Sequence, residues 1–407
     1  MNVRNLLLTA PLAAVLACGG STTTGAGSAS LDAAVPTFAK LAIDQVATDT
    51  SPPAATATPT VAAGATAAAL MGGAGGVCHP RLFEREREVV ERVNRHVYKA
   101  LRLVERVIAT NPVSATDTTK TWTRSENGVD VSVTITLVDP NVYSWTLAVG
   151  PTGTAPLSVV LSGEIDRNGY TGAHEGKGTL DIDFAKLHSA FPGEKAATGT
   201  LEVRFDVSAA ARTIAARATD VTWDLDPARF DGGVVPAGLT VPRDGAYLYH
   251  REPGKGGSLK IQDEMVFLCA MAPAVTNPTL TPASTQVVSR WYHAADGSFH
   301  GRTDGKITGG QLVAPVASIV GTVCHSASGE QAMPDREFFW MMKAEDSAGL
   351  LVPGLGMEVN ASTGSATPAC DTAYGAVPVL ANADLDFKAW PASYFDDPFF
   401  PFLPPVP

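Results

Sequence analysis

Four side chains between residues 293 and 304 are the best candidates for chemistry in this sequence. His293, Asp296, His300 and Asp304 are nitrogen and oxygen donors of the kinds that bind zinc, and they surround an Asp-Gly pair where a hairpin is expected. The two strands of such a hairpin could bring the histidines together. We therefore weigh a metal-dependent hydrolase using this hairpin against a plain polar turn, which we favour because hairpins commonly expose polar side chains.

Two further carboxylates, Asp181 and Asp183, stand two residues apart. Residues with this spacing share one face of a strand, as a pair used for acid and base catalysis can. The residues that alternate with them, Leu180, Ile182 and Phe184, are apolar. We therefore expect the two carboxylates to lie on the solvent-facing side of a strand.

The sequence motifs of several enzyme classes are absent. No GxSxG or HExxH occurs, and GAHEGKGTL and EPGKGGS lack the spacing and residues of a phosphate-binding loop. DRNGY at 166–170 lacks the alternating acidic residues of a calcium-binding loop, so it is interpreted as a turn. We assign no catalytic residue and expect no cofactor, with zinc at the hairpin as the one exception to test.

Composition indicates a folded protein that does not bind nucleic acid. The chain has 407 residues, of which 45% are hydrophobic and 17% charged, so a substantial core can form. The formal net charge is -11, whereas phosphate backbones require clustered cations.

The five cysteines divide into one near the N-terminus and four further along. Cys78, Cys269, Cys324 and Cys370 form an even set, which predicts two disulfides in an oxidising compartment without deciding among the three possible pairings. The alternative is four free thiols. Neither Cys-His pair has the spacing of a haem or zinc motif.

The N-terminus has the layout of a secretory signal, with Arg4 before the apolar stretch from Leu6 to Leu16. Val15-Leu16-Ala17-Cys18 resembles the lipobox of bacterial lipoproteins. That resemblance implies a signal peptide at 1–17, acyl chains such as palmitate on Cys18, and a membrane-anchored protein of the cell envelope. The outer membrane or surface of a Gram-negative bacterium is the location it suggests, and plain secretion is the alternative.

Residues 18–77 are rich in Ala, Thr, Gly, Ser and Pro, which predicts a flexible tether between the lipid and the folded part. Too few strongly apolar residues are present for a membrane span. Within the tether, Leu31, Val35, Phe38 and Leu41 have the spacing of a short docking helix that Pro36 would interrupt.

The first long element is an amphipathic helix expected over residues 79–110. Its apolar residues recur at steps of three, four and seven: Phe83, Val90, Val93, Val97, Leu101, Val104 and Ile108. Eight Lys or Arg stand against five Glu, so the segment has a charge of +3. A basic amphipathic helix can lie on an anionic membrane. We favour the alternative, in which the helix covers an acidic sheet.

After Pro112 the apolar period changes to two, which predicts strands. The alternating sets are Val129 to Leu137, Tyr143 to Val149, Val159 to Ile165, Leu180 to Phe184, Leu201 to Val207 and Val221 to Leu225. Asn127-Gly128 and Asn168-Gly169 are typical of tight hairpins. Short links between such strands predict an antiparallel meander whose apolar face needs a cover.

Strands are expected again at Tyr247–Tyr249 and Met265–Cys269, and a Pro-rich run near residue 280 suggests a boundary. We therefore divide the folded part into a helix-plus-sheet domain at 78–275 and a β-rich region at 276–407 that could belong to the same domain. The second region contains hairpins and an aromatic, Pro-rich tail, which either binds a partner or docks on its own domain.

The predicted fold is α+β and mainly β: an antiparallel meander, half-barrel or sandwich-like, covered by one long amphipathic helix. The order of elements over residues 78–270 resembles the LolA/LolB-like half-barrel carriers of lipoproteins. That resemblance implies an apolar ligand or lipid, and no residue motif accompanies it. We therefore expect a non-enzymatic envelope lipoprotein that binds such a ligand or another envelope protein. A structural surface lipoprotein without ligand is the alternative.

Overall fold

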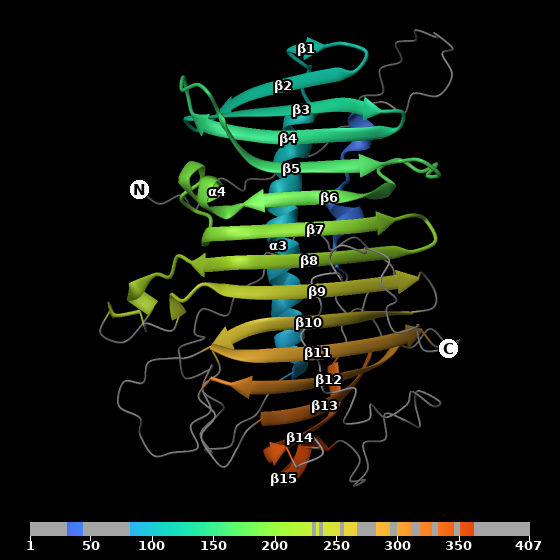
Figure 1. Cartoon of the computed structure of the whole chain (residues 1–407), viewed down its shortest axis with the longest axis vertical. Coiled ribbons are helices and arrows are strands. Elements are labelled where there is room, and N and C mark those ends of the chain that lie inside the picture. Colours follow the sequence, from blue (N-terminus) through green and yellow to red (C-terminus); the bar gives the residue numbers. More distant parts are fainter. Residues whose placement is uncertain are drawn as a thin grey trace.

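The computed structural model describes residues 31–43, 82–229, 233–235, 239–252, 256–266, 282–293, 299–310, 318–327, 333–345 and 351–361. Within these residues, fifteen strands form one antiparallel sheet from β1 (Ser114–Ala115) to β15 (Leu351–Ala361), each paired with its neighbours in sequence (Figure 1). A long helix, α3 (Leu82–Ile108), runs across one face of the sheet. The predicted antiparallel meander with a helical cover is confirmed.

The other strands follow one another in chain order. They are β2 (Thr119–Glu126), β3 (Val129–Asp139), β4 (Val142–Pro151), β5 (Ser158–Asp166), β6 (Gly176–Asp183), β7 (Ala196–Val207), β8 (Arg212–Trp223), β9 (Arg243–Glu252), β10 (Gly256–Val266), β11 (Pro282–His293), β12 (Phe299–Gly309), β13 (Ser318–Ala327) and β14 (Met333–Glu345). The short helix α4 (Phe184–Ala190) follows β6, and a 3₁₀ turn, η2 (Pro227–Arg229), follows β8.

Helix α3 buries the apolar stripe expected from its sequence. Its buried residues include Val90, Val93, Val97, Leu101 and Val104. The helix ends at Ile108, two residues before its predicted end and before Pro112, since a proline disfavours helical backbone in the residue that precedes it. The Trp122 indole of β2 donates to the Thr110 carbonyl at 3.1 Å, which pairs one of the carbonyls beyond the helix end.

The sheet is concave towards α3. Both ends of the helix approach the sheet backbone, at β2 and β3 on one side and at β12 and β13 on the other. The helix is about 40 Å long at 1.5 Å per residue, so it spans the concave face as a chord. The gap beneath its middle is wider, and the large side chains Phe184, Phe205, Trp145 and Tyr247 belong to the main hydrophobic core that includes residues of the helix and of the sheet.

The hairpins and alternating strands agree with the sequence in most places. Asn127 and Gly128 both have positive φ, 54° and 81°, as a tight two-residue hairpin requires. Four details of the prediction are wrong. Strand β10 begins at Gly256 instead of Met265, and β8 ends at Trp223, before Leu225. Val159 is 45% exposed because the β4–β5 register shifts between Leu147 and Ala148. Phe184 is buried as expected, but it begins α4 instead of continuing β6.

The sheet continues without interruption past the Pro-rich run near residue 280. Strand β10 pairs with β11 from Gly256↔Tyr292 to Val266↔Pro282. The described strands on either side of residue 276 therefore belong to one sheet.

An N-terminal segment, Leu31–Ile43, packs on the same side of the sheet as α3, and we call it the N-terminal strap (Figure 1). It contains a 3₁₀ turn, η1 (Leu31–Ala34), and one helical turn, α1 (Phe38–Leu41), separated around Pro36. Leu31, Val35 and Leu41 are buried, as the predicted docking segment requires.

Candidate functional site

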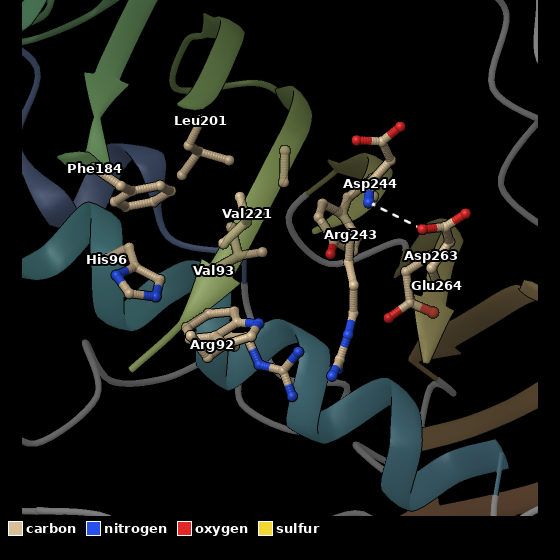
Figure 2. A pocket seen from close by; sticks show the side chains of 14 residues that line it. Arg92, Val93, His96, Phe184, Leu201, Val221, Arg243, Asp244, Asp263 and Glu264 are labelled. Atoms are coloured by element: carbon tan, nitrogen blue, oxygen red, sulfur yellow. Dashed lines mark hydrogen bonds between the residues drawn. The ribbon is translucent and has the colours of Figure 1, made fainter. Parts of the chain in front are cut away.

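A small pocket lies between the middle of α3 and strands β8, β9 and β10 (Figure 2). It encloses about 40 Å³, which is room for a few water molecules. Arg92 and His96 reach it from α3, Trp223 from the end of β8, Arg243 from β9 and Asp263 from β10. Its position corresponds to the wider gap beneath the middle of the chord-like helix.

His96 is a buried ionisable group of this pocket, at 7% exposure. Its ring packs against Phe184 at 5.0 Å and against Trp223 at 5.6 Å between ring centres. Burial lowers the pKa of His96 to about 4, although the nearby carboxylate of Glu194 opposes the shift. The imidazole is therefore neutral near pH 7.

Glu194, in the turn before β7, lies beside His96. Its Oε1 lies 3.5 Å from His96 Nδ1 and accepts the Lys195 amide at 2.8 Å, while Oε2 contacts Lys99 Nζ at 3.0 Å. Burial raises the pKa of Glu194, but the nearby Lys99 and the hydrogen bonds from Lys99 and from the Lys195 amide oppose it, and the net pKa is lowered. Glu194 is therefore ionised beneath a neutral histidine.

Two arginines border the pocket. The Arg92 guanidinium lies 5.1 Å from the ring centre of Trp223, a cation–π arrangement. Arg243 reaches from β9 towards α3, and its Nη2 donates to the Leu239 carbonyl at 3.0 Å (Figure 2). Asp263, which is 5% exposed, lines the same pocket. The pocket therefore joins an aromatic wall to charged groups of both signs.

The pocket offers an imidazole, carboxylates and cations, but its lining lacks hydroxyl and thiol groups of Ser, Thr and Cys. A neutral imidazole backed by a carboxylate can accept a proton. However, the residues lining this pocket include no Ser, Thr or Cys that could serve as a nucleophile beside His96.

A second polar cluster lies under the N-terminal part of α3. Glu86 is 1% exposed, and its Oε2 accepts hydrogen bonds from Ser289 of β11 at 2.5 Å and from Thr303 of β12 at 2.9 Å. Burial raises the pKa of Glu86 to about 7, and these two hydrogen bonds oppose the rise. These hydrogen bonds join α3 to β11 and β12, so we interpret the cluster as an anchor for the helix.

The predicted zinc ligands occupy the β11–β12 hairpin, with Asp296 outside the described residues. The register pairs His293 with Phe299 and His300 with Tyr292, and Asp304 pairs with Val288. The positions of the two histidines therefore differ by one residue in the strand register, and the histidines are not cross-strand partners. Among the described residues, no group of three His, Cys, Asp or Glu side chains is placed to share a metal ion. Zinc binding by these four residues stays a prediction.

Of the cysteines, Cys324 lies in β13 opposite Arg302 and Arg336. Cys18, Cys78, Cys269 and Cys370 lie outside the described residues, so the lipid attachment and the two disulfides stay predictions.

The acidic pair of β6 has the expected solvent-facing position. Asp181 is exposed and lies opposite Glu202, and Asp183 caps α4 by accepting the Lys186 amide at 3.1 Å. Their surroundings are those of a strand surface and a helix cap.

The pocket residues were not found by sequence reasoning. His96 follows Val93 by three residues and precedes Ala100 by four, so it has the spacing of the buried stripe. That spacing was the one available signal for it. Nothing local connects it with Trp223 or Arg243, which are more than a hundred residues away.

Comparisons with models of protein families, with curated proteins and with solved structures gave no match for this chain. The lipobox resemblance and the likeness to LolA/LolB-like carriers in element order remain predictions. Among the described helices, none combines the length and the apolar character needed to cross a membrane.

Proposed function

We propose that this chain is a lipid-anchored binding protein of the bacterial envelope that holds a partner protein. The signal-like N-terminus and Cys18 support the location and the anchor. The pocket at His96 supports binding through a few polar groups beside an aromatic wall, the usual composition of a recognition site.

The tight packing beneath α3 favours a protein as the bound partner over a lipid. Core side chains fill the space between the helix and the sheet, and the pocket encloses about 40 Å³. Pockets for drug-sized ligands measure roughly 300–1,000 Å³. A side chain or a small polar group presented by a partner fits this space, whereas an acyl chain does not.

Site-specific photocrosslinking in cells tests this proposal. A benzophenone amino acid in place of Arg92, at the pocket, is expected to give one discrete adduct. The matched control has the benzophenone amino acid in place of Thr134, on the outward side of β3, and should not give that adduct. Saturable binding of N-phenyl-1-naphthylamine that a fatty acid displaces would overturn the proposal in favour of a lipid carrier.

A further inference from the structure

The C-terminal half of α3 carries exposed cations on the side that faces away from the sheet. Arg95, Lys99, Arg102 and Arg106 recur there at steps of three and four. Arg124 of β2 joins them, because Arg106 and Arg124 both contact Glu126 Oε2, at 3.5 and 3.3 Å. We call these five cations the basic face.

The basic face is positive within a strongly acidic chain. Its cations contact three carboxylates, Glu194, Glu105 and Glu126, which leaves a net charge of about +2 at this surface. The whole chain carries -11. The opposing charge elsewhere favours one orientation of the molecule towards an anionic surface.

An aromatic residue lies within the basic face. Tyr98 stands between Arg95 and Arg102 on the helix and is 38% exposed. Its ring meets Phe38 of the N-terminal strap edge-on, with ring centres 5.0 Å apart. Tyrosine is enriched where proteins meet the headgroup region of a membrane, because its ring is apolar and its hydroxyl polar.

The N-terminal strap is fastened beside this helix. The Asn94 side chain of α3 exchanges two hydrogen bonds with the Ile43 backbone, at 2.8 and 2.5 Å. Arg212 of β8 donates to the Ala42 carbonyl at 2.6 Å. These contacts hold the strap on the same side of the sheet as the basic face.

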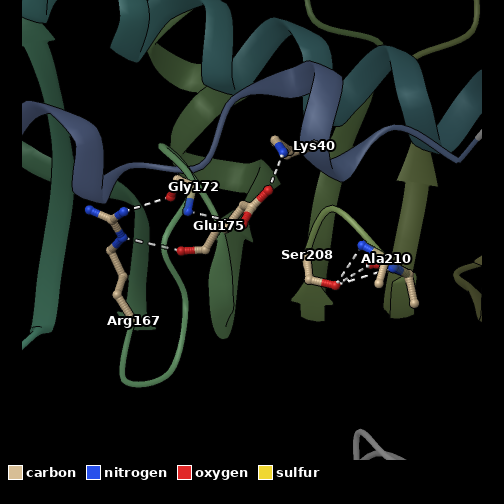
Figure 3. A network of polar contacts seen from close by, with 7 residues as sticks. Lys40, Arg167, Gly172, Glu175, Ser208 and Ala210 are labelled. Atoms are coloured by element: carbon tan, nitrogen blue, oxygen red, sulfur yellow. Dashed lines mark hydrogen bonds and ion pairs between the residues drawn. The ribbon is translucent and has the colours of Figure 1, made fainter.

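A salt bridge ties the middle of the strap to the loop between β5 and β6 (Figure 3). Lys40 Nζ lies 3.1 Å from Glu175 Oε1, and Glu175 Oε2 accepts the Gly172 amide at 3.1 Å. Arg167 donates to the carbonyls of Gly172 and Glu175, at 2.7 and 3.2 Å. A Cβ on Gly172 would overlap the Glu175 carboxylate, so a larger residue there would require that side chain to move.

The strap also fixes where the chain leads back towards Cys18. Its first turn, η1, contacts β3, next to the strand β2 that packs on the C-terminal half of α3. Thirteen residue steps separate Leu31 from Cys18, so a lipid on Cys18 lies at most about 45 Å from Leu31. The sheet measures roughly 67 Å across its fifteen strands at about 4.8 Å spacing. An anchored molecule therefore keeps its β1–β5 end, with the basic face, near the membrane.

We infer that the basic face docks on an anionic lipid bilayer, so that α3 lies against the headgroups while Cys18 holds the chain in place. This inference rests on the lipid anchor of the proposed function. The recognised chemistry is the phosphate of phosphatidylglycerol-type headgroups, which attract each nearby Lys or Arg.

Vesicle binding by the non-lipidated mature chain tests the docking by itself. The chain with Cys18→Ser is expected to sediment with phosphatidylglycerol-containing vesicles at low salt. It should not sediment with pure phosphatidylcholine vesicles, nor at about 1 M salt, where charges are screened beyond about 3 Å. Arg95→Gln combined with Arg102→Gln should weaken the partition coefficient about 30-fold. Equal binding to both kinds of vesicle, or no binding to either, overturns the inference.

The matched control neutralises two cations on the opposite side of the sheet, Lys177→Gln with Arg204→Gln. Vesicle binding by this control variant should equal that of the unmutated chain. An equal loss of binding in the control would show that docking does not depend on the basic face. Circular dichroism and thermal melting of each variant separate lost docking from lost folding. Labelling of cells with radioactive palmitate, with Cys18→Ala as the blank, tests the anchor separately. Vesicle binding without label would refute the anchor alone, and label without vesicle binding would refute the docking alone.

Discussion

Two ionisable side chains, Glu86 and His96, are buried beneath the same helix ten residues apart, in unlike surroundings. Glu86 meets the neutral hydroxyls of Ser289 and Thr303, and burial raises its pKa to about 7. His96 meets the ionised Glu194, yet burial lowers its pKa to about 4. Burial favours the uncharged form in both places. The difference is that Glu86 titrates near neutral pH whereas His96 stays neutral there.

The two groups consequently give stability opposite dependences on pH. The folded state holds the Glu86 proton more tightly than the unfolded chain, so this contribution is complete below about pH 4.5 and is lost as the pH rises to about 7. His96 holds its proton less tightly when folded. Its contribution is complete above about pH 6.5 and is lost as the pH falls to about 4.

The largest predicted effect is that of Glu86→Gln on the pH dependence of unfolding. The wild-type chain should lose about 3 kcal/mol from this group between about pH 4.5 and about pH 7. Glutamine cannot ionise, so the variant should lack that loss and gain stability relative to wild type as the pH rises. Urea unfolding at the two pH values measures the difference.

The control for Glu86 is Glu88→Gln, because Glu88 is exposed on the same turn of α3. The free energy of unfolding of Glu88→Gln should change with pH as that of the wild-type chain does. If Glu86→Gln leaves the wild-type pH profile unchanged, Glu86 does not reduce stability near neutral pH, and the proposed contrast with His96 is wrong.

The second effect concerns the middle of the helix. His96→Phe keeps an aromatic ring against Phe184 and Trp223 but cannot take up a proton. The variant should lose the acid sensitivity between about pH 6.5 and about pH 4, which we expect to be about 3 kcal/mol, close to the effect at Glu86. Unfolding by urea across this range checks it. An undiminished loss of stability on acidification would assign the effect to other groups.

Much of the fold could be predicted because its signals are local. The stripe Val90, Val93 and Val97 predicted the helix, and Asn127-Gly128 predicted a hairpin that has the expected positive φ values. The failure at Val159 has a local cause too, since a register shift moves the residue to the other face. Alternation alone does not show where a strand takes such a shift.

The two buried ionisable groups could not be predicted, because their partners are remote in sequence. Glu86 has the spacing of the buried stripe, but its hydroxyl donors come 203 and 217 residues later. A charged residue at the margin of an apolar stripe is usually assigned to the solvent side. The packing of β11 and β12 under the helix decides otherwise, and only the tertiary fold contains that information.

A third prediction concerns the hydrogen bond that Ser289 donates to Glu86. Ser289→Ala removes a hydroxyl that donates to the Glu86 carboxylate, so the chain should be destabilised by about 1–2 kcal/mol above pH 7. The pKa of Glu86 should also rise further, since that hydrogen bond lowers it. Ser132→Ala on the outward side of β3 is the control and should have little effect. An unchanged Glu86 titration in Ser289→Ala would show that Ser289 does not stabilise the carboxylate.

The smallest effect is expected at Lys99, the half-exposed partner of Glu194. Its side chain is 43% exposed, so Lys99→Met should cost less than about 1 kcal/mol. The charge of Lys99 lowers the pKa of His96, and its removal should therefore raise that pKa from about 4. The imidazole proton shifts in NMR spectra follow this titration. Arg102→Met removes a neighbouring cation that pairs with Glu105, and it should leave His96 unchanged. If the pKa of His96 rises in Lys99→Met but not in Arg102→Met, the contacts among His96, Glu194 and Lys99 set that pKa. Equal shifts in both variants would mean that the overall charge of the helix sets it.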